Sequence, residues 1–211
     1  MSEQKYYKSA TGVDEFYYSE LDETGAGITL NDPELVDFAQ TINIEMPQDS
    51  TRAYGSNKTA EIAVSSGDVS VTAAFHRIPE QDKQRLFGLE KTETGLYAYG
   101  SNDSPPYVGV VFAKTFEDGS KEYVGLPKGM FMRPNQEAKT KEGGGVEFSN
   151  EETSAEFMDR KVAGFDEEKT VIFGRDAKGS TTARDAIFQA VFGRPYPSTP
   201  TTTTTTSGAG A

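Results

Sequence analysis

Runs of alternating apolar and polar residues recur along most of this chain and predict a β-rich domain. The clearest run spans residues 69–78, where apolar side chains at every second position predict a strand with one buried face. Those side chains are Val69, Val71, Ala73 and Phe75. Comparable runs predict strands at 13–19, 35–46 with a break near Gln40, 59–65, 96–99, 107–115, 121–126, 129–132, 146–149, 153–158 and 170–173.

Turn residues predict how some of these strands connect. Asp118-Gly119 tolerates the positive φ angles of a tight turn, so it predicts an antiparallel hairpin of strands 107–115 and 121–126. The Ser-Gly-Asp turn at 66–68 predicts a second hairpin, formed by the strands on either side of it.

Two polar stretches lack the alternation of a strand. Residues 48–58 contain Gly55 and Asn57, and residues 135–145 end in three glycines. Glycine and asparagine accept backbone conformations that regular strands do not use. Both stretches are therefore expected to be loops.

Two segments carry helical signals. Residues 79–89 begin with proline, which suits a first helical turn, and Gly88 is expected to end that helix. Residues 180–192 form a C-terminal helix, with Ser180 or Thr181 as its cap. Its apolar stripe consists of Ala183, Ile187, Ala190 and Val191.

The C-terminal end is of low complexity. Residues 195–211 read PYPSTPTTTTTTSGAGA and carry no charge. Such a segment buries too little apolar surface to offset the entropy lost on ordering, so it is expected to be disordered. The chain is thus divided into one β domain, residues 1–194, and a threonine-rich tail, residues 195–211.

The charge of the chain disfavours two kinds of partner. With 21 basic and 33 acidic residues the net charge is -12, which argues against binding nucleic acid or an anionic membrane surface. The first fifty residues hold eleven of the acids, from Glu3 to Asp49, against Lys5 and Lys8. The excess of negative charge is therefore concentrated in the first quarter of the chain.

Candidates for catalysis are few. The chain has no cysteine, which excludes disulfides and thiol catalysis. His76 is expected to be an ordinary residue on the polar side of its strand. The pairs Glu151-Glu152 and Glu167-Glu168 could supply two catalytic carboxylates, although adjacent acids more often form a solvated surface. No cofactor and no metal ion are expected.

Three segments, taken in order, carry a resemblance to a known family. They read GVDEFYYSELDE, RAYGSNKTAEIAVSSGDVSVTAAFHRIPEQDKQRLFG and PPYVGVVFAKTFEDGSKEYVGLPKGMFMRPNQEAKTKEGGGVEFSNEETSAEF. The second contains a YG-x-N loop and a short helix, and the third contains a Lys-Gly-x-Phe strand and a Thr-Lys-x-Gly loop. Over residues 13–192 this order resembles the major tail proteins, or tail tube proteins, of long-tailed phages with non-contractile tails.

The resemblance implies both a fold and a function. The fold is mainly β: a β-sandwich or rolled β-sheet with one flanking short helix, a C-terminal helix and the disordered tail. The function is structural rather than enzymatic, because six copies form a ring, rings stack into the tail tube, and DNA is ejected through the lumen without specific binding. The implied partners are further copies of the chain, a tape-measure protein and tail completion proteins. Assembly takes place in the host bacterial cytoplasm, and the mature location is the virion tail.

The resemblance also suggests where the working surfaces lie. Candidates for an acidic lumen wall come from the acid-rich first quarter: Glu34, Asp37 and Glu45. The polar stretch 48–58 is the candidate stacking arm, represented by Asp49, Arg52, Tyr54 and Asn57. The stretch 135–145 is a second candidate contact loop, represented by Lys139, Lys141 and Gly144.

Two other classes of protein remain open at this point. A non-catalytic β-sandwich that binds a surface ligand would stay monomeric and expose an aromatic platform. A carboxylate-dependent hydrolase would need two acids of raised pKa in one cleft.

Overall fold

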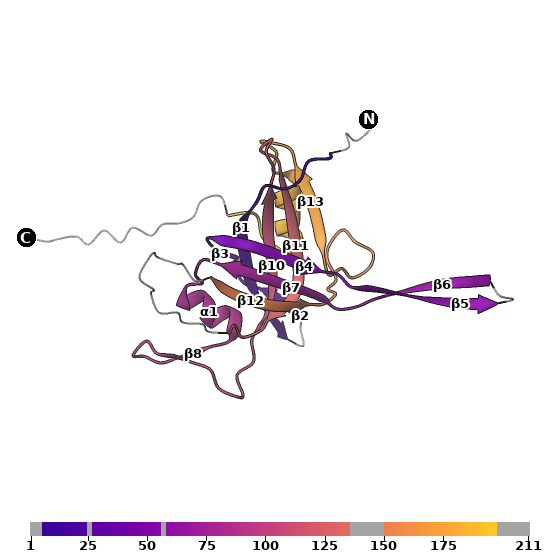
Figure 1. The fold of residues 1–211 in the computed structure, drawn as a ribbon. Helices are drawn as coiled ribbons and strands as arrows, with labels where there is room; N and C mark the ends of the chain where they lie inside the picture. Colours follow the sequence, from indigo (N-terminus) through magenta and orange to yellow (C-terminus); the bar gives the residue numbers. More distant parts are fainter. Residues whose placement is uncertain (1–5, 25–26, 56–57, 136–149, 198–211) are drawn as a thin grey trace, which may run out of the picture.

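The computed structural model describes residues 6–24, 27–55, 58–135 and 150–197, which form a mainly β fold (Figure 1). Nine of its strands make one antiparallel sheet in the order β2-β1-β10-β11-β12-β7-β4, with β3 paired to β1 and β13 to β11. These strands are β1 (Gly12–Thr24), β2 (Gly27–Leu30), β3 (Glu34–Val36), β4 (Ala39–Glu45), β7 (Val69–Phe75), β10 (Tyr107–Thr115), β11 (Lys121–Phe131), β12 (Glu151–Phe157) and β13 (Ile172–Asp176).

The sheet folds over so that its two halves enclose an apolar core. One half is β1, β10 and β11, and the other is β12, β7 and β4. Phe16 on β1 and Phe75 on β7 are separated by three strands in the sheet, yet their ring centroids lie 5.0 Å apart. The alternate side chains of β7 that the sequence predicts as inward-facing are buried in this core. The arrangement agrees with the expected β-sandwich or rolled sheet.

Helix α1 (Glu80–Phe87) lies beside this core (Figure 1). Its Leu86 and Phe87 are buried, and it ends at Gly88, whose φ of 66° is left-handed, as the sequence predicts. The buried Tyr18 hydroxyl donates a hydrogen bond to Asp82 Oδ1 at 2.7 Å and so ties β1 to the helix. A small hairpin follows, made of β8 (Glu90–Lys91) and β9 (Tyr97–Ala98).

Helix α2 (Thr182–Phe192) covers the outer face of β10, β11 and β13. A Cβ atom on Gly125 would lie 2.7 Å from Val191 Cγ2, and one on Gly174 would lie 3.1 Å from Ala183 Cβ. Glycines on the strands therefore let the helix approach closely. The buried side chains of α2 are Ile187, Phe188, Val191 and Phe192.

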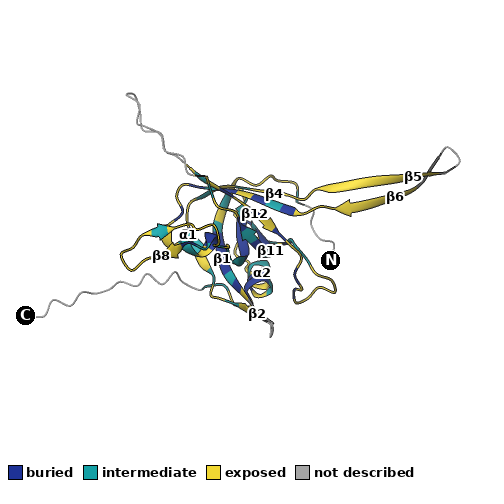
Figure 2. Ribbon diagram, turned by 90° about the horizontal axis from the view of Figure 1, so that it is seen from below, coloured by how far each residue is buried: buried dark blue, intermediate teal, exposed yellow. Residues whose placement is uncertain are grey.

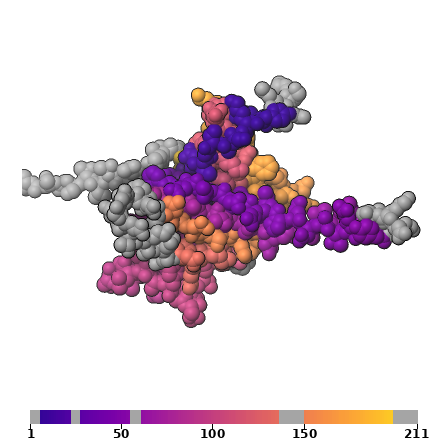
Figure 3. All heavy atoms as spheres, viewed as in Figure 1, coloured from indigo at the N-terminus to yellow at the C-terminus, as the bar shows by residue number. Residues whose placement is uncertain are grey.

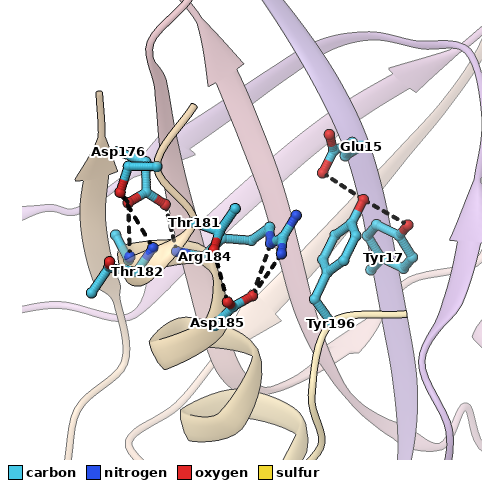
Figure 4. A network of polar contacts seen from close by, with 10 residues as sticks. Glu15, Tyr17, Asp176, Thr181, Thr182, Arg184, Asp185 and Tyr196 are labelled. Carbon is cyan, nitrogen blue, oxygen red and sulfur yellow. Dashed lines mark hydrogen bonds and ion pairs between the residues drawn. The ribbon is translucent and has the colours of Figure 1, made fainter. Parts of the chain in front are cut away.

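Asp176, at the end of β13, supplies most of the cap of α2 (Figure 4). Its carboxylate accepts hydrogen bonds from the backbone N–H groups of Ala183 at 3.0 Å and Arg184 at 2.9 Å. It also accepts one from Ser180 Oγ at 2.8 Å. Burial acts to raise the pKa of the Asp176 carboxyl, but these hydrogen bonds hold that pKa below its ordinary value. The Thr181 side chain, one of the two predicted caps, makes no capping hydrogen bond.

The chain stays attached to the body after α2. The centroids of the Tyr196 and Phe188 rings lie 4.9 Å apart, and the Arg184 guanidinium carbon lies 3.8 Å from the centre of the Tyr196 ring. The Tyr196 hydroxyl donates to Glu15 Oε2 at 3.2 Å and lies 3.4 Å from the Tyr17 hydroxyl (Figure 4). The attached chain thus includes part of the segment that the sequence assigns to the tail. Residues 198–211 lie outside the described ranges.

The β10–β11 hairpin is confirmed, but the predicted hairpin around the turn at 66–68 is wrong. Thr115 pairs with Lys121 around the predicted Asp-Gly turn. By contrast, β7 pairs with β4 and β12, and not with the strand that precedes it. The predicted break near Gln40 is confirmed: the strand is interrupted at Asp37 and Phe38, between β3 and β4, and the register of β4 with β7 shifts between Ala39 and Thr41.

A two-stranded hairpin, called here the arm, projects from the body (Figures 1 and 3). It consists of β5 (Gln48–Gly55) and β6 (Lys58–Ser66), so the predicted loop at 48–58 is wrong over most of its length. The arm begins and ends at one point, where the Gly67 N–H donates to the Pro47 carbonyl at 2.9 Å. Its described side chains are exposed along both strands (Figure 2). This polar segment can form strands because its backbone groups pair with the neighbouring strand while its side chains remain in water.

Candidate functional site

The outer face of β4, β7 and β12 is an open polar surface. Side chains alternate along these three strands: the inward positions are apolar except Glu151 and Thr153, and the outward positions are polar except Ala74. On the other half of the sheet, α2 covers the corresponding outer face. The outward residues are Thr41, Asn43 and Glu45 on β4, Ser70, Thr72 and Ala74 on β7, and Glu152, Ser154 and Glu156 on β12. We call these nine residues the open face.

The strand register arranges the open face in rows. Glu156 lies opposite Ser70, and Ser70 lies opposite Glu45, so two glutamates flank a serine in the row nearest the arm. Strands two apart are about 10 Å from each other, which is close to the Debye length at physiological salt. Since the nine residues include no lysine or arginine, their charges reinforce one another. Such a surface repels a polyanion.

The open face ends at β11. Met130 lies opposite Glu156, and the Lys128 ammonium sits 4.6 Å from the centre of the Tyr107 ring. The Lys128 cation is thus placed over an aromatic ring at the border of the open face.

The arm is the second notable surface, because it lacks a core of its own. Tyr54 is 71 % exposed, Ile62 is 56 % exposed and Val64 is 63 % exposed. An isolated two-stranded ribbon is marginally stable in water and gains stability when it packs against another surface. Exposed apolar side chains on such a ribbon indicate a binding partner.

The acids of the first quarter of the chain lie mainly elsewhere. Glu34 accepts a hydrogen bond from Arg85 Nη1 at 2.6 Å, which raises the pKa of Arg85. Glu20 lies 3.8 Å from the same guanidinium, and burial raises the pKa of the Glu20 carboxyl. Together with Tyr18 and Asp32, these residues line a depression of about 300 Å³. Two of the N-terminal acids, Glu20 and Glu34, are therefore paired with Arg85 on the α1 side of the molecule.

The side chains of the candidate catalytic pair, Glu151 and Glu152, point to opposite sides of their strand. Glu151 points inward, where Oε2 accepts from the Ile78 N–H at 3.0 Å and Oε1 accepts from Lys83 Nζ at 2.9 Å. Glu152 points outward from the same strand, as alternation requires. Within the described ranges, no cluster of His, Asp or Glu is suited to hold a metal ion, and neither helix is long and apolar enough to cross a membrane.

Comparison with known families identifies the chain. A family model described as phage tail tube protein matches residues 17–195. The chain belongs to the phage tail tube protein family. A search of curated proteins gave no match. The resemblance seen in the sequence is thus confirmed, and this tail tube protein is a structural component of the virion tail that assembles into a tube.

The predicted site residues of this tail tube protein fall in different places. Among the lumen candidates, Glu45 lies on the open face, Glu34 pairs with Arg85, and Asp37 is exposed between β3 and β4. Among the arm candidates, three are exposed on β5: Asp49, Arg52 and Tyr54. The remaining candidates lie outside the described residues: Asn57, Lys139, Lys141 and Gly144.

The lumen candidates predicted from the sequence did not include Glu152 and Glu156, which the structure places on the open face. The sequence prediction placed the acidic wall where acids are dense, but five of the acids in residues 1–50 form ion pairs, such as that of Asp14 with Lys121 at 2.8 Å. The alternation of residues 151–157 carried the needed signal, because its outward positions are Glu, Ser and Glu.

Proposed function

We propose that six copies of this tail tube protein form a ring, that rings stack into a tube, and that the open face lines the channel through which DNA is ejected. Glu45, Glu152 and Glu156 then present negative charge to the passing duplex. A like-charged wall of short side chains keeps DNA moving, because it offers neither cations for the phosphates nor rings for stacking bases.

One observation carries this proposal: the open face is acidic and no described element covers it, while α2 covers the matching face of the other half-sheet. A solvent-exposed outer face is common in antiparallel sheets and by itself indicates no function. A face that is wet, bears only negative charge and consists otherwise of small side chains suits a conduit for a polyanion.

We assign the stacking of rings to the arm, in keeping with its exposed apolar residues and its projection from the body. The stretch 135–145, with Lys139, Lys141 and Gly144, remains the second proposed contact. A tape-measure protein in the lumen before ejection and tail completion proteins at the tube ends are the proposed partners, and the host bacterial cytoplasm is the proposed place of assembly.

Cysteine labelling tests the channel assignment. The chain has no cysteine, so Thr72→Cys and Ala186→Cys each introduce a single reactive thiol, one on the open face and one on the exposed side of α2. In free subunits, a small maleimide and a large polymer-linked maleimide should label both variants. In tubes, the large reagent should label Ala186→Cys and should fail at Thr72→Cys, because it cannot enter the lumen.

Equal labelling of both variants in tubes by the large reagent would place the open face outside and overturn the assignment. Electron microscopy of the same samples gives the ring symmetry and tests the sixfold count. Isolated particles at every concentration would instead favour a surface-binding module.

A further inference from the structure

Phe38 lies in solvent in a backbone conformation that a phenylalanine rarely adopts. Its side chain is 76 % exposed and its φ angle is 63°, in the left-handed region. The conformation is held by a hydrogen bond from the His76 N–H to the Phe38 carbonyl at 3.1 Å. A Cβ atom makes this region unfavourable, and burial of so exposed a ring cannot offset the strain within the subunit. Strained residues of this kind cluster at contact and functional sites.

Phe38 and the arm lie at opposite ends of the same two strands. β4 runs from Ala39, next to Phe38, to Glu45, next to the base of the arm, and β7 returns beside it (Figure 1). The seven residues of β4 span about 24 Å, and the eight residues of β5 extend about 27 Å further. Two copies placed end to end in the same orientation therefore bring Phe38 of one copy alongside the arm of the other.

The two surfaces are complementary in chemistry. Arg52 and Ile62 are a cross-strand pair of the arm, and Val64, two residues from Ile62, shares their face. All three side chains are exposed. At the opposite end of the body, the exposed carboxylate of Asp37 is adjacent to the exposed ring of Phe38. A ring beside a carboxylate can thus meet aliphatic side chains beside a guanidinium.

We propose that Asp37 and Phe38 form the receiving surface for the arm of a second copy in the adjacent ring. Phe38 packs on Ile62 and Val64 of that arm, and Asp37 pairs with its Arg52. The inference rests on the proposed stacking role of the arm. The contact joins two different surfaces head to tail, so it repeats without closing and yields a filament.

Charge reversal tests this pairing. Arg52→Asp and Asp37→Arg each bring like charges together, and each should raise the protein concentration needed for tube growth by about tenfold. The double variant restores an opposite pair and should return that concentration to within about twofold of the wild-type value. Glu93→Arg, which changes an exposed acid near the β8–β9 hairpin, is the control for altered net charge and should have no effect.

Phe38→Gly gives an independent result. Glycine accepts the left-handed φ angle, so the melting temperature of the free subunit should hold or rise. Tube growth should nevertheless need about ten times more protein, because the aromatic contact is lost. A residue with a role inside the subunit alone would move stability and assembly in the same direction.

The outcomes separate the two proposals. If wild-type protein forms tubes but the double reversal grows no better than the single variants, the receiving surface is elsewhere and the stacking role of the arm stands. Normal tube growth by Phe38→Gly or by the single reversals overturns the receiving surface in the same way. If wild-type protein forms no tubes, the stacking role fails and this inference fails with it.

Discussion

Asp176 illustrates how one buried carboxylate can fix a helix to a sheet. It ends β13, is 3 % exposed, and accepts two backbone N–H groups from the first turn of α2. Hydrogen bonds to an ionised acceptor are stronger than neutral ones, and the negative charge also suits a helix N-terminus. The capping residue lies five positions before Thr181, so the usual sequence signal for a cap, a short polar residue at the helix start, did not point to it. Of the two residues that the signal did indicate, Thr181 makes no capping hydrogen bond and Ser180 Oγ accepts one from the Thr182 N–H at 3.5 Å.

The lowered pKa of Asp176 predicts a pH dependence of stability. Asp176→Asn should reduce the free energy of unfolding by about 1–3 kcal/mol near neutral pH. Because the folded-state pKa lies below the unfolded value of about 3.9, this contribution is complete above that value and is lost as pH falls through the folded-state pKa. Urea unfolding of both proteins at several pH values provides the measurement.

The gap in stability between wild type and Asp176→Asn should therefore close as the medium is acidified below about pH 4. Asp68→Asn, at an exposed turn, is the matched control and should show little difference from wild type at any pH. A gap that stays constant over the whole range would contradict the role given to the ionised carboxylate.

At the scale of elements, the seating of α2 depends on residues without side chains. Gly125 on β11 and Gly174 on β13 lie beneath the helix, and Gly109 on β10 has Val191 Cγ1 3.0 Å from where its Cβ would be. Residue types that signal turns in a sequence are used here for close packing. This is one reason why a helix can be predicted from its apolar stripe while its place on the sheet cannot.

Gly125→Ala should push α2 away from β11. The new methyl group would meet Val191 Cγ2 at 2.7 Å and Ile187 Cγ2 at 3.0 Å, both in a packed core. The expected loss is about 1–3 kcal/mol in the free energy of unfolding, measured by urea denaturation. Gly12→Ala, whose Cβ would meet a threonine hydroxyl at 3.1 Å at the sheet margin, should lose less. Equal losses in both variants would mean that the close seating of the helix is unimportant.

The strands themselves were largely predictable, and their partners were not. In β7 and β12 apolar and polar residues alternate because one face of each strand is buried, so both strands can be predicted from their own residues. β6 and β7 are consecutive and joined by a turn, yet they belong to different sheets, because β7 pairs with strands distant in the chain. β5 has no buried face at all, so no alternation could reveal it. For the same reason, the polarity of residues 48–58 predicted an exposed contact segment but did not predict that it forms one strand of a hairpin.

At the scale of the whole molecule, we expect that the arm can be removed without loss of the body's fold. Its ends meet where the Gly67 N–H donates to the Pro47 carbonyl at 2.9 Å. Replacing residues 48–66 by Asn-Gly would close the same hydrogen bond as a two-residue hairpin turn. The melting temperature should stay within about 2 °C of wild type, since a loss of 1 kcal/mol would shift it by that much or more.

Assembly should fail in this armless variant. Sedimentation and microscopy at high protein concentration should find folded subunits or isolated rings in place of tubes. Tubes of normal length would show that rings stack through a contact other than the arm. A large fall in melting temperature would show that the body depends on the arm for its own stability.

The narrow base of the arm has a mechanical consequence. Where the arm leaves the body, load passes through two chain segments near Pro47 and Gly67, whereas the body is a double-layered sheet backed by a helix. Bending is taken up where a structure is thinnest, and in proteins a few residues at the end of an element suffice for it. If the arms join the rings as proposed, we expect the tube to flex at these necks, so that the tail curves while each ring keeps its bore round.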